Sequence, residues 1–449
     1  MATQETTREV ARDTAPTAGR APTERRYELD WLRAFVVLGL IPIHAAVIFS
    51  STADVYIKNS QTNQIMALLG AFAGAWGMPL LFLVAGASAY FALNRRTGPT
   101  YLKERVMRLL VPFVFATLVI VPVQVYAIAL NNPGVVTTYG LPIHNPDFLS
   151  SYPAFYVEYL QGYLYFLTHF STTLAIIFWG HLWFIPRLFA YALCTLPIFF
   201  FFKSRQGVRL LEALSRFVRY PGAIFLFALP LMLVEMLLRA TQVNALTAHW
   251  PLYDDWIQFA FYLVYFVYGY LVFAIASMPR AIVRHGWLAL ALGVVGFGLA
   301  LTQASTLTID PLNYSLGYVA GWPIRGLVGW FWVVAILSMA LLRLGFTNGL
   351  LRYLNDAAFP IYVLHMPIVT IVGVYVISLD IPWELKFALI ILAAATLTVA
   401  LYELAVRRIG VMRALFGLKP RPPAPNAPQR EPRRHGWKPF TTGGHGYVR

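Results

Sequence analysis

The chain has 449 residues, of which 58% are apolar and 12% charged, and its mean hydropathy is +0.61. Soluble globular proteins carry about 25% charged residues, so this composition excludes a soluble protein and a disordered one. The single cysteine, Cys194, excludes an intrachain disulfide and a cysteine-cluster metal site. The net charge of +15 is compatible with a nucleic-acid or a membrane partner, and the positions of the charges decide between them.

The two ends of the chain are polar. Residues 1–28 hold five basic and five acidic residues without an apolar run, which predicts a disordered cytoplasmic tail and no cleavable signal peptide. Residues 407–449 hold ten basic residues, one acidic residue and several prolines. This composition favours a solvated basic tail beside anionic lipid heads, and no nucleic-acid partner is expected because no nucleic-acid-binding module accompanies it.

Between the tails, residues 29–406 alternate apolar runs with short polar breaks, which predicts a membrane-embedded domain. A helix needs about 20 apolar residues to cross a bilayer. Ten segments fit: 29–50, 68–93, 109–130, 180–202, 222–240, 255–277, 286–303, 318–342, 358–378 and 384–406. We therefore predict an all-α, polytopic membrane helix bundle of about ten transmembrane helices.

The polar breaks sort by charge into two alternating sets. One set is rich in Lys and Arg, whereas the other holds only Lys58 and Lys386 as bases beside eight acidic residues. The basic set comprises Arg95, Arg96, Lys103, Arg105, Arg108, Lys203, Arg205, Arg209, Arg216, Arg219, Arg280, Arg284, Arg343 and Arg352. The positive-inside rule places this set and both termini in the cytoplasm, as expected for a multi-pass protein of the cell inner (plasma) membrane.

The predicted outer loop at 131–179 is long and aromatic. It carries Tyr139, Phe148, Tyr152, Phe155, Tyr156, Tyr159, Tyr163, Tyr165, Phe166 and Phe170. These rings are typical of an interfacial aromatic belt, and the alternative is a platform on which sugar rings stack. Part of 161–178 has the composition of an extra or re-entrant helix.

The first span contains an arginine and a histidine eleven residues apart, Arg33 and His44. At about 100° and 1.5 Å per residue, they share nearly the same helix face about 16 Å apart along the axis. Ionisable residues inside a span are candidate functional residues, and a neutral imidazole suits general-base chemistry near neutral pH. The alternative is a hydrogen-bonded core histidine and an interfacial arginine.

Two other histidines fall within spans, His181 and His365. Each alone is more often a satisfied bundle residue than a catalyst. His44, His181 and His365 are far apart in sequence and lack a paired ligand motif, so no metal site is predicted.

Several charged residues also lie in predicted spans. Glu235 and Arg239 have i,i+4 spacing, which favours a structural ion pair. Arg187 and Arg325 lack an acidic partner on the same helix, so each could meet an anionic substrate group or an acidic residue of another helix. Glu403 is expected to be a structural partner for a base.

On the cytoplasmic side, Arg105 and Arg108 have i,i+3 spacing in KERVMR before the third span. Positive-inside charge explains either one, and a pair of guanidiniums that binds phosphates is the alternative. A glycine-rich phosphate loop does not occur, so nucleoside triphosphate hydrolysis is not expected.

Seven motifs, in this order, give the chain a recognisable pattern. They are RRYELDWLRAFVVLGLIPIHAAVIFSS with its Arg-x10-His, MPLLFLVAGASAYFALNRR, KERVMRLLVPF with its Arg-x-x-Arg, HLWF, FYLVYFVYGYLVF, YLNDAAFPIYVLHMPI and LYELAVRRIGVMRALFGLKP. Across residues 25–420 the chain resembles the membrane acyltransferase 3 family and, within it, the group of glucan succinyltransferases.

This resemblance implies transfer of an acyl group from cytoplasmic acyl-coenzyme A to a carbohydrate hydroxyl outside, with no tightly bound cofactor. It further implies that Arg33 and His44 are the essential pair, that His44 is catalytic, and that Arg105 and Arg108 belong to the coenzyme end. His181 and His365 fall in motifs with less settled roles. Arg187 and Arg325 are not part of the family pattern.

A residue buried between an inner donor and an outer acceptor must meet both, which His44 can do. We expect His44 to act as general base, with a covalent acyl-histidine as the variant, and Arg33 to bind the donor or stabilise negative charge. Arg105 and Arg108 would hold the nucleotide phosphates, and His181, Trp183 and His365 would contact the acceptor.

The main alternative is a multi-span transporter of a small polar or anionic solute. Proton coupling usually employs buried carboxylates, and only Glu235 and Glu403 lie clearly inside spans. Inverted repeats, which alternating access favours, are not visible in the sequence. A scaffold or receptor, the third class, has no need of a polar lane through the first span. The acyl group, succinyl or acetyl, and the acceptor are not decided by the sequence.

Overall fold

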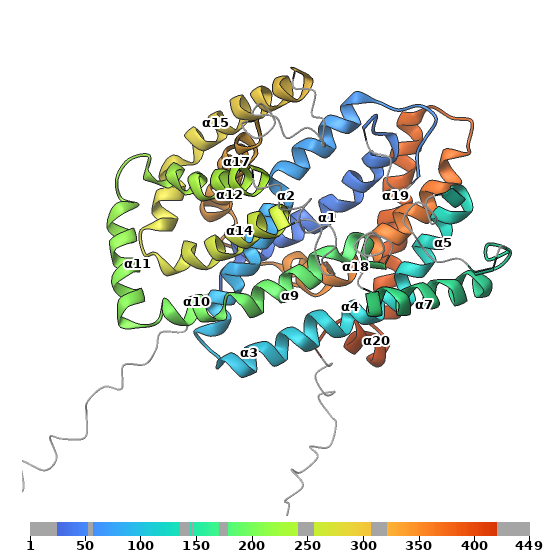
Figure 1. The fold of residues 1–449 in the computed structure, drawn as a ribbon, viewed down its shortest axis with the longest axis horizontal. Helices are drawn as coiled ribbons and strands as arrows, with labels where there is room; N and C mark the ends of the chain where they lie inside the picture. Colours follow the sequence, from blue (N-terminus) through green and yellow to red (C-terminus); the bar gives the residue numbers. More distant parts are fainter. Residues whose placement is uncertain are drawn as a thin grey trace, which may run out of the picture.

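The computed structural model describes residues 25–52, 57–134, 144–145, 147–169, 178–240, 256–306 and 321–419. Every regular element in these ranges is helical, and the pairing of β type within them is one isolated bridge between Ser50 and Asn63. Figure 1 shows α1 and α2 crossing the middle of the bundle, with α12, α15 and α17 on one side and α5, α18 and α19 on the other. The predicted all-α membrane bundle is confirmed.

Eight helices of the described ranges are long and apolar enough to span a membrane. They are α1 (Tyr27–Phe49), α2 (Gln64–Leu93), the continuous run from α3 to α5 (Gly98–Asn131), α14 (Trp256–Ala274), α15 (Met278–Thr306), α17 (Pro323–Arg343), α18 (Gly349–Ile377) and α19 with its π-helical extension η5 (Trp383–Leu401 and Tyr402–Val406). Each coincides with one of the ten predicted spans. The protein is therefore a multi-pass membrane protein.

The other two predicted spans, 180–202 and 222–240, are built from shorter pieces. The first comprises the 3-10 turn η3 (Gly180–Trp183), α9 (Phe184–Cys194) and α10 (Leu196–Phe201). Helices α9 and α10 meet at Thr195, two residues before Pro197. The second comprises the 3-10 turn η4 (Ala223–Phe227) and α12 (Ala228–Ala240). Hydropathy predicts where these segments lie but cannot reveal that they are broken.

Several helices begin well before the predicted apolar segments. The third span starts at Gly98 instead of 109, α15 at Met278 instead of 286, and α18 at Gly349 instead of 358. The polar first turns continue the same helices beyond the apolar core. The basic segment 205–217 also forms a helix, α11 (Arg205–Phe217), which begins where the Ser204 hydroxyl accepts the Gly207 N–H. Apolarity thus marks the membrane core and not the helix ends.

The third span is irregular and anchors an extra helix. It runs through α3 (Gly98–Arg105), η1 (Val106–Leu110), α4 (Val111–Phe115), η2 (Ala116–Ile120) and α5 (Val121–Asn131), of which η1 and η2 are π-helical. Pro122 has no N–H to donate to the carbonyls one turn before it. The Thr117 and Leu118 carbonyls instead accept the hydroxyls of Tyr159 at 2.8 Å and Tyr156 at 3.0 Å.

Both tyrosines belong to α7 (Tyr152–His169), which overlaps the segment 161–178 of the predicted extra helix as far as residue 169, whereas residues 170–177 lie outside the described ranges. Phe155 and Tyr159 are fully buried, and Phe166 is nearly so. These rings pack inside the protein, which is neither of the two roles that their composition suggested. Tyr139 and Phe170 lie outside the described residues.

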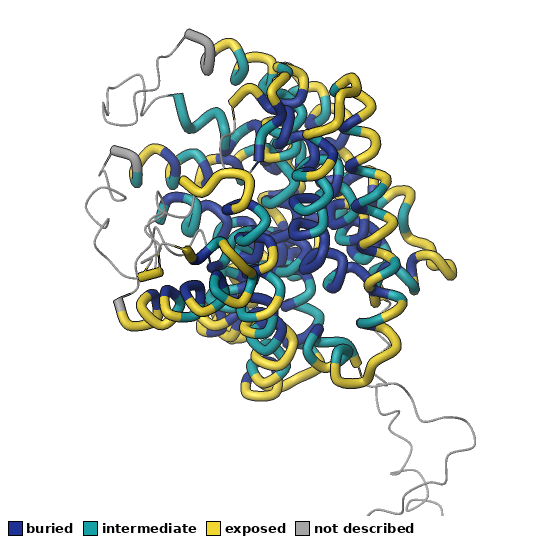
Figure 2. The backbone as a smooth tube through the Cα atoms, turned by 90° about the vertical axis from the view of Figure 1, so that its right-hand side faces the viewer, coloured by how far each residue is buried: buried dark blue, intermediate teal, exposed yellow. Residues whose placement is uncertain are grey.

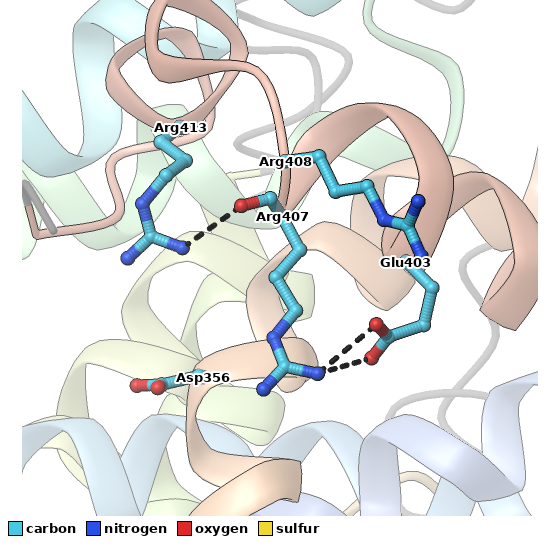
Figure 3. Close-up of a pocket in the computed structure, with 5 residues that line it drawn as sticks. All are labelled: Asp356, Glu403, Arg407, Arg408 and Arg413. Carbon is cyan, nitrogen blue, oxygen red and sulfur yellow. Dashed lines mark hydrogen bonds and ion pairs between the residues drawn. The ribbon is translucent and has the colours of Figure 1, made fainter.

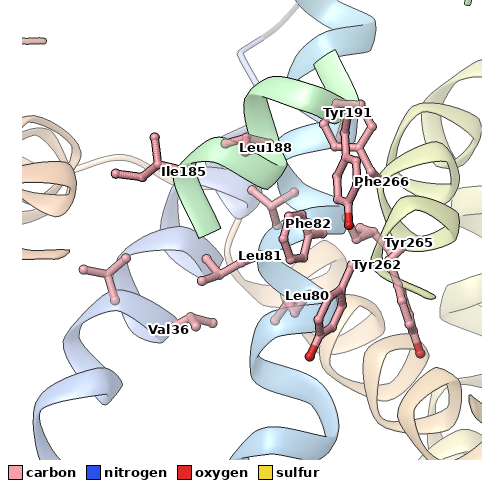
Figure 4. Close-up of a cluster of buried hydrophobic side chains, with 14 of the residues drawn as sticks. Val36, Leu80, Leu81, Phe82, Ile185, Leu188, Tyr191, Tyr262, Tyr265 and Phe266 are labelled. Carbon is pink, nitrogen blue, oxygen red and sulfur yellow. The ribbon is translucent and has the colours of Figure 1, made fainter. Parts of the chain in front are cut away.

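The core lies where α1, α2, α9 and α14 meet. Figure 4 shows Val36 of α1, Phe82 of α2, Tyr191 of α9 and Tyr262 of α14 converging there. The Phe82 ring lies 4.9 Å from that of Tyr262 and 5.2 Å from that of Tyr191. Aromatic pairs at these separations add to the stability gained from burial alone.

The outer surface of the bundle is apolar. Figure 2 shows the most buried backbone in the middle of the bundle and exposed segments around it. Among the most exposed side chains of the long helices are Val295 on α15 at 61% and Leu392 on α19 at 69%. A soluble protein would not expose so many large aliphatic side chains, so these faces suit contact with lipid.

Candidate functional site

The polar residues of α1 lie at two levels of the helix. Arg33, 38% exposed, donates to the Ser88 hydroxyl of α2 at 3.1 Å and lies 3.5 Å from the carboxylate of Asp30 one turn earlier. Asp30 also pairs with Arg25 at 2.9 Å. Eleven residues further along, His44 is half-buried. The predicted separation of a cationic end and an imidazole on one helix is therefore present.

The ring of His44 contacts another predicted site residue, His365 of α18. The ring centroids are 5.0 Å apart, and His365 Nε2 lies 3.4 Å from His44 Nδ1. His365 is completely buried. The two imidazoles face each other at the packed junction of α1 and α18, so His44 points into the bundle and not toward lipid.

His181 completes a cluster of three imidazoles. Its ring lies 5.4 Å from that of His365 and nearly perpendicular to it. His181 Nε2 lies 3.0 Å from the Val363 carbonyl, and the Tyr362 hydroxyl donates to the His181 carbonyl at 2.6 Å. The turn η3 is thus tied to α18 on both sides of its histidine. We call His44, His181 and His365 the histidine cluster.

A proline explains why Val363 can accept the imidazole. In an α-helix the carbonyl of residue 363 would receive the N–H of residue 367, but that residue is Pro367, which has none. The freed carbonyl is buried within the bundle and needs a donor. His181 supplies it.

The hydrogen bonds also fix which nitrogen of each ring carries hydrogen, because a carbonyl oxygen only accepts. His44 Nδ1 lies 2.8 Å from the Leu40 carbonyl, and His365 Nδ1 lies 2.7 Å from that of Tyr362. Both rings therefore carry hydrogen on Nδ1. His44 Nδ1–H is shared between the Leu40 oxygen and His365 Nε2, and the Nε2 of His44 is left with a lone pair, as a general base requires.

His181 has the opposite arrangement. Its Nε2 donates to Val363, so its Nδ1 is an acceptor, and this buried atom has no hydrogen-bond partner. Within the described residues, no cluster of His, Cys, Asp and Glu side chains has the geometry to hold a metal ion. The arrangement can accept protons at two imidazole nitrogens.

Beside the cluster, Trp183 lies within an aromatic group. Its ring stacks on Tyr262 at 5.8 Å, and the guanidinium of Arg187 lies 4.6 Å above it. The half-buried indole therefore presents a ring bordered by a cation.

Arg325 is engaged by an acidic residue of another helix. It lies 3.1 Å from the carboxylate of Glu235, whose side chain is fully buried. A partner on another helix, one of the two alternatives for Arg325, is thus confirmed. The predicted partner of Glu235 on its own helix was Arg239, whose side chain lies outside the described residues.

Arg105 and Arg108 differ in their surroundings. The guanidinium of Arg105 lies 4.8 Å above the buried ring of Tyr101, and its charge acts on Arg33. Arg108 is exposed on η1, where the chain is π-helical, so the angle between the two side chains differs from that of the predicted i,i+3 pair. Arg105 is therefore half-buried against Tyr101, whereas Arg108 is exposed.

A polar cavity of about 420 Å³ lies among α18, η5 and the C-terminal segment. Figure 3 shows its lining side chains, which are Asp356, Glu403, Arg407, Arg408 and Arg413. Arg407 donates to both oxygens of Glu403 at 2.8 and 3.0 Å, which raises the pKa of Arg407 and confirms Glu403 as a structural partner of a base. Arg413 donates to the Lys419 carbonyl at 2.7 Å and to that of Arg407 at 3.4 Å.

Asp356 lies nine residues before His365 on α18, about 13 Å along the axis. The cavity therefore lies toward the N-terminal end of α18, away from the histidine cluster. Arg407 and Arg413 also bind groups of the protein itself. Since the cavity is separated from the three histidines, it is not the place where the imidazoles act.

The sequence is similar to proteins of one family over most of its length. The family profile described as an acyltransferase domain matches residues 26–403. Proteins named glucans biosynthesis protein C from Salmonella paratyphi B, Salmonella dublin and Salmonella enteritidis PT4 are 23% identical over 413 residues, which cover 89% of this chain and 96% of each relative. No solved structure matches the chain significantly. The chain belongs to the acyltransferase 3 family, whose profile spans every residue of the histidine cluster, and it is a membrane acyltransferase.

Proposed function

We propose that the protein transfers a succinyl or acetyl group from cytoplasmic acyl-coenzyme A to a hydroxyl of an extracytoplasmic carbohydrate, from the inner (plasma) membrane. Family membership supports acyl transfer, and the name of the relatives supports a glucan as acceptor. The observation that carries the proposal is the tautomer of His44, whose Nε2 keeps a lone pair inside the bundle.

In the proposed reaction, His44 Nε2 removes the proton from the acceptor hydroxyl as the oxygen attacks the thioester carbonyl. The C–O bond of the ester forms and the C–S bond breaks. The coenzyme thiolate then takes the proton back from the imidazolium of His44, so that no net charge remains. In a variant, His44 Nε2 itself attacks the thioester, and an acyl-histidine passes the acyl group to the hydroxyl.

The donor end of the site is proposed to lie at Arg33 and Arg105, with Arg108 at the surface. Arg33 has donors beyond those used by Ser88 and Asp30, and a guanidinium suits a phosphate or a developing negative charge. Arg105 adds positive potential there. Arg108 is exposed and is available to the nucleotide phosphates.

The acceptor end is proposed to lie at His181 and Trp183. The unpaired Nδ1 of His181 would accept a hydroxyl hydrogen bond, and the exposed part of the half-buried Trp183 indole would contact the sugar. Arg187, above the same indole, is placed to attract the free carboxylate of a succinyl group. His365 is completely buried and contacts both other histidines, so its proposed role is to support them and not to contact the acceptor directly.

A proton-coupled transporter is less compatible with the described residues. Glu235 and Glu403, the two carboxylates predicted inside spans, are paired with Arg325 and Arg407. Each of these carboxylates therefore already has a basic partner within the protein.

The test replaces His44 by Ala or Asn in the full-length protein in liposomes supplied with labelled succinyl- or acetyl-coenzyme A and cell-envelope glycan. We expect loss of transfer while membrane insertion and the elution volume on size exclusion stay unchanged. Retained transfer by the variant would refute His44 as base and nucleophile. Mass spectrometry of envelope glycans with and without the gene names the acyl group and the acceptor from one mass shift.

A further inference from the structure

We propose that His365 is a positioning residue that holds His44 in its basic tautomer by accepting the Nδ1–H. The inference rests on the proposed function and adds a second histidine to it. His365 is completely buried and lies 3.4 Å from His44 Nδ1 through its own Nε2. Since Nε2 of His365 carries no hydrogen, it meets the Nδ1–H of His44 as an acceptor.

The acceptor is rigidly oriented. His365 Nδ1–H is directed at the Tyr362 carbonyl at 2.7 Å, with the Ile361 carbonyl at 3.2 Å. The other tautomer of this ring, with hydrogen on Nε2, would place an N–H against the N–H of His44 and a lone pair against two carbonyl oxygens. The Nδ1–H tautomer avoids both repulsions, so the carbonyls of α18 dictate that the bare nitrogen of His365 faces His44.

His181 holds α18 in place from the other side. The Nε2–H of His181 donates to the Val363 carbonyl, and the His181 carbonyl accepts the hydroxyl of Tyr362. Both of these α18 residues lie within one turn before His365. The ring of His181 packs edge-on against that of His365 at 5.4 Å. Two hydrogen bonds between η3 and α18 therefore stabilise the turn of α18 that carries His365.

A carboxylate usually fills this role, as aspartate does in serine hydrolases. Among the described residues, the Leu40 carbonyl on α1 and His365 on α18 contact His44, and the ring of His365 in turn contacts His181 on η3. No described hydrogen bond or ion pair joins any of these imidazoles to an acidic side chain. A neutral partner suits a buried site because it adds no second charge to desolvate.

The contact with His365 strengthens in the transition state. When His44 takes a proton on Nε2, its Nδ1–H becomes a charged donor, and charge-assisted hydrogen bonds are roughly twice as strong as neutral ones. An interaction that strengthens at this step raises kcat rather than lowering KM. The inference therefore predicts an effect of His365 on kcat with an unchanged KM for the acyl donor.

The test compares His365→Phe and His365→Gln with matched variants of another buried histidine. His285 on α15 has the same bonding pattern, since its Nδ1–H binds the Ala281 carbonyl at 2.9 Å and its Nε2 accepts the Gly222 N–H at 3.1 Å. His285 contacts neither His44 nor His365 among the described residues. His285→Phe and His285→Gln thus measure the structural effect of losing such a histidine.

We expect His365→Phe to lower kcat about 10- to 100-fold. The loss is smaller than the about 10⁴-fold cost of a wrong tautomer in a serine protease, because the Leu40 carbonyl still holds the Nδ1–H. His365→Gln, whose side-chain oxygen can accept in place of Nε2, should retain more activity than His365→Phe and covers the case in which the phenylalanine variant fails to insert. The His285 variants should keep the wild-type kcat.

A second readout does not depend on activity. Solid-state ¹⁵N NMR of the full-length protein in liposomes, labelled on its nine histidines, distinguishes protonated from bare ring nitrogens. The His44 signals are assigned by their loss in His44→Asn. We expect hydrogen on His44 Nδ1 in the wild type and a measurable minor fraction with hydrogen on Nε2 in His365→Phe, where the Leu40 carbonyl alone holds the Nδ1–H.

An unchanged tautomer in His365→Phe, or a loss of kcat no larger than in His285→Phe, would overturn the role of His365. A shifted tautomer with wild-type kcat would overturn it equally. Failure of the proposed function looks different, because transfer would then survive in His44→Ala whatever the tautomer.

Discussion

The tightest helix crossing in the described structure is made by two reciprocal glycines, Gly86 of α2 and Gly269 of α14. A Cβ atom on Gly86 would lie 1.8 Å from the Phe266 carbonyl oxygen, and one on Gly269 would lie 1.8 Å from the Leu83 carbonyl oxygen. Small residues permit such close approach of helix backbones in membranes. We predict that Gly86→Ala and Gly269→Ala each destabilise the protein strongly.

The magnitude follows from the contact distance. Carbon and oxygen in van der Waals contact are about 3.3 Å apart, so an added methyl must move the helices by about 1.5 Å. The obstacle is backbone and cannot rotate away. Overpacking of a core costs about 1–3 kcal/mol and occasionally more, and we expect the upper part of this range. The slope falls as the chain grows and is about 1–2 °C per kcal/mol for 449 residues, so the apparent melting temperature should fall by about 3–6 °C.

The shift also reaches the site. Phe82 on α2 and Tyr262 on α14 both contact Trp183, next to His181, at ring distances of 6.3 and 5.8 Å. Acyl transfer should therefore fall together with stability.

The assay is thermal unfolding of the detergent-solubilised protein, followed by fluorescence-detected size exclusion. Gly77 provides the control in the same helix α2, because a Cβ there meets nothing within 4 Å. Gly77→Ala should raise stability by about 0.5–1 kcal/mol, since alanine is the better helix former. Equal melting temperatures for Gly77→Ala and Gly86→Ala would refute the reasoning.

Three further predictions concern single hydrogen-bond networks. Pro367→Ala returns an N–H that competes with His181 for the Val363 carbonyl, so we expect a lower rate of acyl transfer at an unchanged or higher melting temperature. The control is Pro360→Ala on the same helix, and a similar rate for both variants would contradict the role of Pro367. Lys386 is 7% exposed and donates hydrogen bonds to the Ile377 carbonyl at 2.8 Å and to Asn59 Oδ1 at 3.3 Å. Lys386→Met should therefore lower the free energy of unfolding by about 1–3 kcal/mol, as measured by thermal unfolding, and wild-type stability of the variant would show that these bonds contribute nothing. The carboxylate of Glu158 accepts hydrogen bonds from the backbone N–H groups of His144 and Asn145 at 2.8 and 3.1 Å. Glu158→Gln should therefore speed proteolysis near His144 and Asn145, whereas unchanged cleavage would mean that the carboxylate does not hold these residues in place.

The membrane bundle was predictable because crossing a bilayer imposes a length and a composition on each helix. The breaks within 180–202 and 222–240 were not, since 3-10 turns and helix junctions leave hydropathy unchanged. Of the aromatic residues in 152–166, which were predicted at a surface, Phe155, Tyr159 and Phe166 are buried, whereas Tyr165 is 45% exposed. Composition cannot distinguish rings that face lipid from rings that face a neighbouring helix, because both surroundings are apolar. The sidedness of the loops and the limits of the two tails stay predictions.

For the site, the spacing of residues within one helix could be used for prediction, whereas contacts between helices could not be predicted. Arg33 and His44 were predicted on one helix, and the family motifs brought His181 and His365 forward. That His44, His181 and His365 meet depends on how α1, η3 and α18 pack, which no local pattern encodes. Glu235 likewise binds Arg325, 90 residues away. One local signal was available: Pro367 lies four residues after Val363, so a freed carbonyl beside His365 could have been expected.

The division between the cationic end and the histidine cluster follows from the cost of burying charge. Desolvating an ionised group costs several kcal/mol even after relaxation, so phosphates of a coenzyme should remain at Arg33 and Arg105, near the end of the bundle. The histidine cluster is neutral in the tautomers assigned by its hydrogen bonds. In the proposed reaction, His44 becomes a transient imidazolium, which the Leu40 carbonyl and His365 Nε2 stabilise until the coenzyme thiolate takes its proton. An acetyl group would then pass from one side of the membrane toward the other without a permanent charge entering the apolar core, whereas a succinyl group would carry its carboxylate toward Arg187.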